Sequence, residues 1–379
     1  MKRIAIILAL ALIISGLPVL SHAAPAEVPA KSALLMDAAT GTILYEQNSH
    51  EKLAPASVTK VMTMLLIMEA IDSGRIGWND TVTASEAAAA KGGSQVYLKV
   101  GETMTVTDMV KSIAVSSAND CACAMAEHIA GSEEAFVDMM NRRAEELGMA
   151  DTHFVNCTGL DDEPDAAEHL TSAHDIALMS RELLTNHPDI KKFTTIWMDT
   201  IRNGTFGLSN TNKLVRFYKG ATGLKTGFTA KAGYCLSASA SRDGMELIAV
   251  VMGSKTSPER FTACKQLLDY GFANYALVQP QVSGGQVPVR LGVQDTVAAV
   301  PSRGVQLLVD RGQRDQVKVE ISLNDQISAP VSKGQRLGTL TVRCGQQILQ
   351  QIPMVAQAGV RRLSWAEQFG RIFRRITMR

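Results

Sequence analysis

One apolar stretch that carries a lysine in its first turn constrains this chain more than any other feature. From Val58 to Ile71 nearly every residue is apolar or small, so a helix here has no polar face and must be buried on all sides. Pro55 stands where such a helix can begin, and Asp72-Ser73-Gly74 where it can end. Ser57 and Lys60 are three residues apart and therefore share one face of the first turn.

The lysine in this first turn indicates chemistry. The helix dipole opposes a cation at the N-terminus, and burying the charge is costly. The cost falls if the pKa of Lys60 is depressed, because a neutral amine can be buried and can take a proton from Ser57. The alternative, in which Ser57 is only a helix cap, leaves Lys60 unexplained. We therefore expect Ser57 to be a nucleophile and Lys60 its general base.

Length and composition favour a soluble globular protein of about two domains. The chain has 379 residues, of which 46% are hydrophobic and 20% charged, and its net charge is +1. This charge and the absence of nucleic-acid motifs indicate that nucleic acid is not a partner. The histidines show no metal-binding spacing, so we expect no metal and no cofactor. Six cysteines without C-x-x-C spacing are interpreted mostly as small buried apolar residues.

The N-terminus has the pattern of an export signal, which we predict to span residues 1–23. The basic pair Lys2-Arg3 precedes an apolar run from Ile4 to Ile14, and Ser21-His22-Ala23 fits the small-x-small cleavage rule. An uncleaved anchor is the alternative, although the run is short for a membrane span. We expect the mature protein at the outer face of the cytoplasmic membrane.

Residues 24–277 predict an α+β catalytic domain. Strands are expected in a hairpin over 33–45 and again over 234–241 and 245–252, with helices between these regions and a last helix over 257–274. This order favours an antiparallel sheet, completed at its edge by the N-terminal hairpin and flanked by helices. Residues 203–212 are rich in Gly, Asn and Thr and are interpreted as a loop.

The pattern changes twice after residue 277. Residues 278–358 contain short Val, Leu and Ile runs between Gly, Pro and Asp turns, which predicts a small all-β domain. Residues 359–379 predict an amphipathic helix with arginines on its polar face. Its apolar face comprises Trp365, Phe369, Ile372, Phe373 and Ile376. This pattern favours binding to a membrane surface through residues 361–379, and packing on protein is the alternative.

Three short motifs carry the chemistry together. They are Ser57-Val58-Thr59-Lys60, Ser117-Ala118-Asn119 and Lys225-Thr226-Gly227, with 60 residues from the first serine to the second and 108 from there to Lys225. Each motif is common by chance. Their order, spacing and contexts make strong evidence when taken together.

With these motifs the chain resembles the low-molecular-mass penicillin-binding serine D-Ala-D-Ala carboxypeptidases over essentially its whole length. Other matching stretches are Gly93-Ser94, Asn119-Asp120, Gly159-Leu160-Asp161 and Ala232-Gly233-Tyr234. The resemblance implies a transpeptidase/β-lactamase-like fold for the catalytic domain. It also implies removal of the terminal D-Ala from peptidoglycan pentapeptides through an acyl-Ser57 intermediate, and acylation by β-lactam antibiotics.

The resemblance also implies roles for the motif residues. Ser57 attacks the penultimate D-Ala carbonyl, Lys60 is kept neutral by burial and by nearby cationic Lys225, and Ser117 relays the proton to the leaving amine. Asn119 holds the substrate amide. Lys225 and Thr226, followed by Gly227, bind the terminal carboxylate. The backbone N–H groups of Ser57 and Phe228 form the oxyanion hole.

Three further positions are less determined by the sequence. Arg260, 35 residues after Lys225, matches a carboxylate-binding arginine of relatives, and a surface arginine at a helix end is the alternative. Asp175 matches a family aspartate, but a first-turn helix acid explains it without catalysis. Phe228 stands where many relatives have histidine, which puts any role of that ring in doubt.

Two other functions share the motifs. A secreted serine β-lactamase of class A needs a glutamate that activates water, and His153 occupies the expected position. The β domain and the tail also argue against a diffusible lactamase. A non-catalytic penicillin-binding sensor or scaffold is the second alternative, and it would be acylated without releasing D-Ala.

Overall fold

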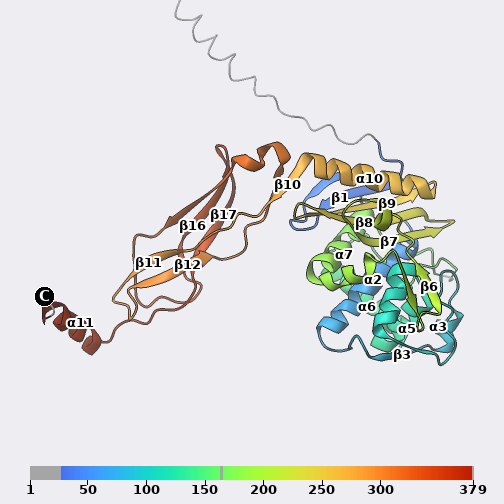
Figure 1. Ribbon diagram of the computed structural model, residues 1–379, viewed down its shortest axis with the longest axis horizontal. Helices are drawn as coiled ribbons and strands as arrows, with labels where there is room; N and C mark the ends of the chain where they lie inside the picture. The colour runs from blue at the N-terminus through green and yellow to red at the C-terminus, as the bar shows by residue number, and fades with distance from the viewer. Residues whose placement is uncertain (1–26, 163–164, 378–379) are drawn as a thin grey trace, which may run out of the picture.

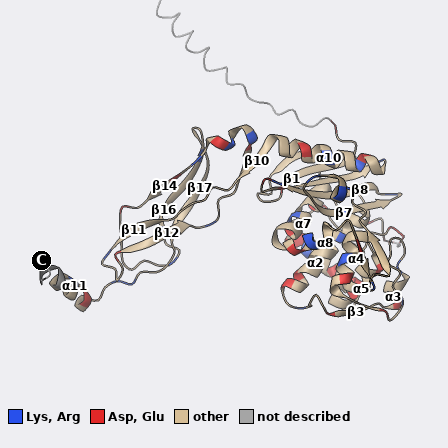
Figure 2. Cartoon of the chain, viewed as in Figure 1, with Lys and Arg blue, Asp and Glu red and all other residues tan. Residues whose placement is uncertain are grey.

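The computed structural model describes residues 27–162 and 165–377, and the side chains up to residue 373. The predicted export signal lies outside the described residues. A larger domain of helices and sheet is followed by an elongated β domain and a terminal helix (Figure 1). Acidic and basic residues are interspersed over the helices of the larger domain (Figure 2).

The larger domain is organised on a five-stranded sheet in the order β2-β1-β9-β8-β7, with antiparallel neighbours throughout. The strands are β1 (Ser32–Asp37), β2 (Ile43–Gln47), β7 (Ala221–Thr229), β8 (Gly233–Arg242) and β9 (Met245–Ser254). In the N-terminal hairpin, β1 pairs with β9, so segments more than 200 residues apart in the sequence lie side by side in the sheet. This confirms the expected sheet and its edge.

Helices cover both faces of the sheet (Figure 1). The helix α10 (Ser257–Asn274) packs on one face, and α7 (Ala173–Asn186) packs on the other with α2 (Lys60–Asp72) beyond it. All residues of β1 are buried, and alternate residues point to opposite faces. Leu34 joins the core on the α2 side, whereas Leu35 joins the core under α10.

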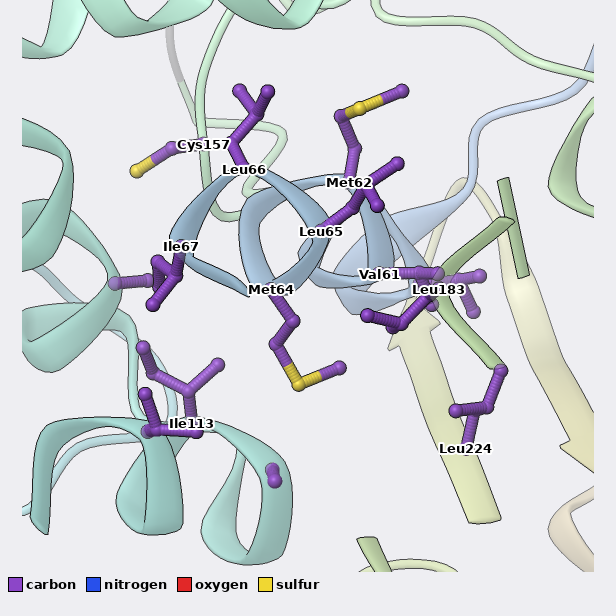
Figure 3. Close-up of a cluster of buried hydrophobic side chains, with 14 of the residues drawn as sticks. Val61, Met62, Met64, Leu65, Leu66, Ile67, Ile113, Cys157, Leu183 and Leu224 are labelled. Atoms are coloured by element: carbon purple, nitrogen blue, oxygen red, sulfur yellow. The ribbon is translucent and has the colours of Figure 1, made fainter. Parts of the chain in front are cut away.

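The helix α2 is the centre of the larger core, and ten of its 13 residues are buried. Its apolar side chains point in different directions around the helix axis and meet Ile113, Leu183 and Leu224 from neighbouring elements (Figure 3). A helix surrounded in this way has no amphipathic face, as the uniform apolar run predicts.

The elements around α2 are short. They are η1 (Ala56–Thr59), β3 (Thr81–Thr83), α3 (Glu86–Ala90), β4 (Thr103–Thr105), α4 (Val106–Ser116), α5 (Asn119–Ala130), α6 (Glu133–Glu146), η2 (Pro188–Ile190), α8 (Lys191–Thr194), β5 (Met198–Ile201), β6 (Phe206–Ser209) and α9 (Leu214–Phe217). The prediction of a loop over 203–212 is wrong in part, because β6 lies inside it and pairs with β5. The Gly and Asn residues mark the turn of this hairpin, and strands of four residues are too short to show an alternating pattern.

The β domain has its own sheet and core. Strand β10 (Tyr275–Val278) leaves α10 and pairs with β13 (Leu307–Asp310). The six-stranded sheet has the order β14-β16-β17-β12-β11-β15. Its strands are β11 (Gly285–Arg290), β12 (Thr296–Pro301), β14 (Val317–Leu323), β15 (Ile327–Ser328), β16 (Arg336–Cys344) and β17 (Gln347–Ala356), with η3 (Arg311–Gln316) before β14. Leu340 and Ile352 pair across β16 and β17 inside the buried cluster.

The chain ends in α11 (Trp365–Thr377), which lies at the end of the β domain away from the larger domain (Figure 1). This confirms the predicted terminal helix. Among the described residues, no helix combines the length and the apolar character needed to span a bilayer.

Candidate active site

The structure brings Ser57 and Lys60 together at the start of the central helix. Ser57 lies in the 3₁₀ turn η1, and Lys60 is the first residue of α2. The Nζ atom of Lys60 is hydrogen-bonded to Ser57 Oγ at 3.1 Å and donates to the carbonyl oxygen of Thr158 at 2.7 Å. The lysine is fully buried. This geometry suits proton transfer from the hydroxyl to the amine.

Burial lowers the pKa of Lys60 to about 7, and the negative charges of Asp120 and Glu133 limit this fall. A large fraction of the amine is therefore neutral at neutral pH and able to accept a proton. Burial also holds the pKa of Lys225 well below its usual value, and repulsion from Lys60 and Arg260 lowers it further. The expectation that cationic Lys225 keeps Lys60 neutral is therefore not met: burial lowers the pKa of Lys60, and the repulsion between the two lysines lowers the pKa of Lys225 instead.

Ser117 lies at the junction of α4 and α5, where both helices pack on α2. It is buried and has a left-handed backbone, with φ of 64°. Serine rarely adopts this conformation, and such backbone strain is concentrated at functional sites. The conformation ends α4 and lets α5 begin two residues later at Asn119.

Asn119 connects the helix junction to a loop over residues 92–98. Its backbone N–H donates to Ser94 O and its Nδ2 to Gly92 O, both at 2.7 Å. Its Oδ1 is buried and has no hydrogen-bond partner among the described residues. Asp120 holds the same loop by accepting from the N–H groups of Val96 and Leu98. Asn119 therefore offers an unused acceptor for a substrate N–H.

The third motif lies within strand β7, which packs against η1. Lys225 is buried, and its Nζ donates to Thr226 O at 2.8 Å. Thr226 Oγ1 donates to Thr211 Oγ1 at 2.7 Å. A Cβ atom on Gly227 would lie 2.6 Å from Pro55 O and 3.1 Å from the backbone nitrogen of Ser57. Only glycine allows the strand to approach the serine so closely.

Arg260 is buried in α10 behind this strand, so the surface alternative is wrong. Its Nη1 donates to Gly227 O at 2.9 Å and to Cys235 O at 3.3 Å. Its Nε has no hydrogen-bond partner among the described residues. Phe228 is 53% exposed and stacks on Tyr234, with ring centroids 4.3 Å apart. Through its two hydrogen bonds to the carbonyls of Gly227 and Cys235, Arg260 supports the strand that carries the motif.

Asp175 has a structural role. It lies in the first turn of α7, and its Oδ2 accepts from the N–H of Asp151 and from Thr152 Oγ1, both at 2.8 Å. This agrees with a helix-start acid that needs no catalytic explanation.

Sequence reasoning matched Gly159-Leu160-Asp161 to the family but missed that the turn over residues 156–159 holds Lys60 through its Thr158 carbonyl. Asn156 Oδ1 accepts from the N–H groups of Thr158 and Gly159, which builds an Asx-type turn. A Cβ atom on Gly159, whose φ is +81°, would overlap the carbonyl oxygen of Ala56. The Asn and Gly residues were the available signal, but nothing local shows that the turn meets Lys60.

His169 is a second missed neighbour of the site. Its Nδ1 accepts from the N–H of Val155, so Nε2 carries the proton and faces Thr59 Oγ1 at 2.7 Å. Burial lowers the pKa of His169 to about 4, so the ring is neutral at physiological pH. It supports the η1 turn through Thr59.

One group of side chains in the described part of the chain lies close enough to share a metal ion, namely Glu69, Glu182 and His187. Arg143 donates to Glu69 at 2.7 Å and to Glu182 at 2.6 Å, so a cationic side chain already pairs with both carboxylates. The five cysteines of the larger domain are buried, as interpreted from the sequence, and the structure leaves them unpaired.

The fold and the Ser57–Lys60 pair define a serine-type hydrolase in which a buried lysine stands beside the serine. The peptidase S11 family, described as D-alanyl-D-alanine carboxypeptidase, matches residues 19–256. A second family, described as the C-terminal domain of penicillin-binding protein 5, matches residues 272–362. The chain therefore belongs to the peptidase S11 family of D-alanyl-D-alanine carboxypeptidases.

Individual relatives agree over most of the length. The D-alanyl-D-alanine carboxypeptidase DacF of Bacillus subtilis is 46% identical over 340 residues, which cover 88% of this chain and 86% of the relative. DacC of Escherichia coli K12 is 33% identical over 366 residues, which cover 93% of this chain and 88% of the relative. Penicillin-binding protein 5 from Haemophilus influenzae has a TM-score of 0.75 at 29% identity, covering 89% of this chain and 99% of that one.

A further solved structure bears on ligands. Penicillin-binding protein D2 from Listeria monocytogenes, solved in its ampicillin-bound form, has a TM-score of 0.59 at 31% identity and covers 65% of this chain and 98% of its own. That structure corresponds in extent to a part of this chain only. The match to penicillin-binding protein 5 covers most of the chain, and it supports the predicted fold of a helix-flanked antiparallel sheet followed by a β domain.

Proposed function

We propose that this carboxypeptidase removes the terminal D-Ala of peptidoglycan pentapeptides through an acyl-Ser57 intermediate, and that β-lactams acylate the same serine. The observation that carries the proposal is the 3.1 Å contact between Ser57 Oγ and the Nζ of a fully buried Lys60. Family membership supplies the substrate class, and this contact supplies the nucleophile and its base.

In the first step, Ser57 Oγ attacks the carbonyl carbon of the penultimate D-Ala while its proton passes to Lys60. The N–H groups of Ser57 and Phe228 stabilise the negative charge that develops on the carbonyl oxygen, and one such donor is typically worth ~10²–10³ in rate. The C–N bond then breaks, and Ser117 relays the proton to the leaving D-Ala amine. Water hydrolyses the acyl ester and regenerates Ser57.

Lys225 and Thr226 bind the terminal carboxylate of the substrate. The low pKa of Lys225 reflects a buried amine without a counter-ion, and the carboxylate of the substrate supplies that counter-ion. Arg260 acts from behind the strand: it holds the carbonyl of Gly227 and so positions the motif. The unpaired Oδ1 of Asn119 accepts an N–H of the peptide.

The alternatives have less support. His153, at the position expected for a class A lactamase glutamate, is an exposed histidine whose backbone bridges to Leu170. It offers no carboxylate to activate a deacylating water. The Ser57–Lys60 pair would serve acylation in a penicillin-binding scaffold as well, so D-Ala release is the property that separates the scaffold from the carboxypeptidase.

The test is D-Ala release from a synthetic pentapeptide that ends in D-Ala-D-Ala, by the wild type and by Ser57→Ala. We expect steady release by the wild type and none by the variant. The lifetime of the adduct with penicillin separates the alternatives. Persistence over minutes to hours supports the carboxypeptidase, and turnover within seconds supports a lactamase. Acylation without D-Ala release would leave only the scaffold.

We also propose that the mature protein lies at the outer face of the cytoplasmic membrane, bound through residues 361–379. The support is the exposure of Trp365, Phe369, Ile372 and Phe373, which is 58–87%. These four side chains recur at helical spacing along α11 and form an exposed apolar face. The predicted export signal is consistent with this location.

A further inference from the structure

The turn that holds Lys60 is bonded to α2 at two points. The carbonyl oxygen of Thr158 accepts from Lys60 Nζ at 2.7 Å, and that of Cys157 accepts from Thr63 Oγ1 at 2.6 Å. Lys60 and Thr63 are neighbours along one face of the helix. The position of the Lys60 amine therefore depends on where this turn lies.

Glu133 holds the same turn from its other side. It is the first residue of α6, and its Oε1 accepts from the N–H of Cys157 at 3.1 Å. Its Oε2 forms an ion pair with Lys91 Nζ at 2.7 Å, and both side chains are more than four-fifths buried. An acid at a helix start is ordinary. The next residue, Glu134, is such an acid and is exposed, whereas Glu133 points inward to the turn.

We propose that Glu133 is a positioning residue for Lys60: with Lys91 as its counter-ion, it holds the Cys157–Thr158 turn so that the Thr158 carbonyl keeps the amine beside Ser57. The chain of contacts runs without a gap from the Lys91–Glu133 ion pair through the Cys157 N–H and the Thr158 carbonyl to Lys60. This inference rests on the acyl-Ser57 mechanism proposed above.

The charge of Glu133 also acts on Lys60. The groups that face Lys60 are Asp120 on α5, Glu133 on α6, Cys157 on the turn, Lys225 on β7 and His169 behind Thr59. Burial raises the pKa of the Cys157 thiol well above its usual value, so the thiol stays neutral. The carboxylates of Asp120 and Glu133 are therefore the anions that favour protonated Lys60.

The surroundings of Glu133 keep it ionised. Burial alone would raise its pKa, but the ion pair with Lys91 and the hydrogen bonds from Cys157 lower it below the usual value. The thiol of Cys123 on α5 donates to Glu133 Oε2 at 3.5 Å, and Glu127 on the same helix faces that thiol. The anion is thus present throughout the range in which Lys60 titrates.

The experiment compares Glu133→Gln and Glu133→Ala with the matched control Glu134→Gln. The rate of Ser57 acylation by a fluorescent penicillin is measured from about pH 5 to 9, together with the thermal unfolding midpoint. Gln keeps an oxygen for the Cys157 N–H but removes the charge. Loss of the anion lowers the pKa of Lys60, so the acidic limb of the pH–rate profile moves to lower pH, by about one unit.

Glu133→Ala removes the acceptor as well. We expect its plateau acylation rate to fall about 10- to 100-fold, the effect of misplacing a reacting group by an ångström or less. Glu133→Gln should recover most of that rate, and Glu134→Gln should match the wild type in both rate and profile. A parallel loss of folded protein in both Glu133 variants, with an unshifted profile in what remains folded, would reduce Glu133 to a structural residue and overturn the proposal.

The inference and the function fail in different ways. If the wild type is not acylated at Ser57, the proposed function fails. If the wild type is acylated but both Glu133 variants keep its rate and pH profile, only the role of Glu133 is wrong.

Discussion

Lys60 and Lys225 are wholly buried, and their hydrogen bonds go to a hydroxyl and to backbone carbonyls rather than to a described carboxylate. An uncompensated amine in a protein interior destabilises the fold, and evolution retains such groups where they have chemistry to perform. The three orphaned or strained groups of the site point the same way: the Asn119 Oδ1, the Arg260 Nε and the left-handed Ser117. Stability has been given up at this site for reactivity.

Replacing Lys60 with Met should therefore abolish acylation and stabilise the protein. Removing the desolvated amine is expected to raise the free energy of unfolding by roughly 1 to 4 kcal/mol at neutral pH. Thermal unfolding monitored by circular dichroism measures this change in stability. A lower unfolding midpoint for Lys60→Met than for the wild type would contradict the assigned burial cost.

The same amine makes stability depend on pH. The pKa of Lys60 is about 7 in the folded state, whereas an exposed lysine has a pKa of 10.5. Between these values the unfolded chain binds one more proton, so the wild type gains stability as pH rises through this window. The difference in the free energy of unfolding between Lys60→Met and the wild type should therefore become smaller from pH 7 to 10. A gap that is constant over this range would show that the amine is not desolvated.

At the scale of elements, the site depends on strand β7 lying against the turn η1. Gly227 makes this approach possible because any Cβ there would meet the Pro55 carbonyl. In the proposed mechanism this strand supplies the Phe228 N–H to the oxyanion hole, and Arg260 holds the strand through the Gly227 carbonyl. Geometry at this contact decides whether the oxyanion donors reach their target.

Gly227→Ala should slow acylation of Ser57 about 10²-fold or more, because it displaces a donor of the oxyanion hole. Gly207 is the control, since it lies in strand β6 and has no atom within 4 Å of an added Cβ. Gly207→Ala should keep the wild-type rate in the same penicillin-binding assay. Equal rates for both variants would remove the contact between β7 and η1 from the mechanism.

The sequence predicted the elements with strong periodicity and the residues with unusual chemistry. The apolar run of α2, the hairpin β1–β2 and the α10 helix follow from patterns that extend over many residues. The β5–β6 hairpin was not predicted because its strands have only four residues each. The contacts of the Thr158 carbonyl and of Glu133 were not predicted because they form only when segments distant in the sequence meet near Lys60.

At the scale of the whole molecule, the β domain separates the larger domain from α11 (Figure 1). The helix is bonded to the β domain through Arg371, which pairs with Asp295 at 2.7 Å and donates to the carbonyl oxygens of Gly292 and Val293. Arg361 pairs with Glu367 within the tail. Its aromatic side chains are left exposed. An elongated spacer of this kind would hold a site away from a membrane surface to which the tail is bound.

The full-length protein should therefore sediment with vesicles that contain anionic lipid. Replacing both Trp365 and Phe369 with Ser should weaken this binding about tenfold or more, because the apolar face no longer reaches the acyl region. The double variant should keep the wild-type rate on a soluble pentapeptide. Sedimentation at the wild-type level by the variant would show that the apolar face of α11 does not carry the membrane binding.

The central claim is that Ser57 is the residue that becomes acylated, with Lys60 as its base. Peptide mapping by mass spectrometry after incubation with benzylpenicillin tests it most directly. The account predicts that the mass of the whole antibiotic is added to the peptide containing Ser57, and that Ser57→Ala and Lys60→Met carry no adduct. An adduct on another residue, or unchanged labelling of either variant, would contradict it.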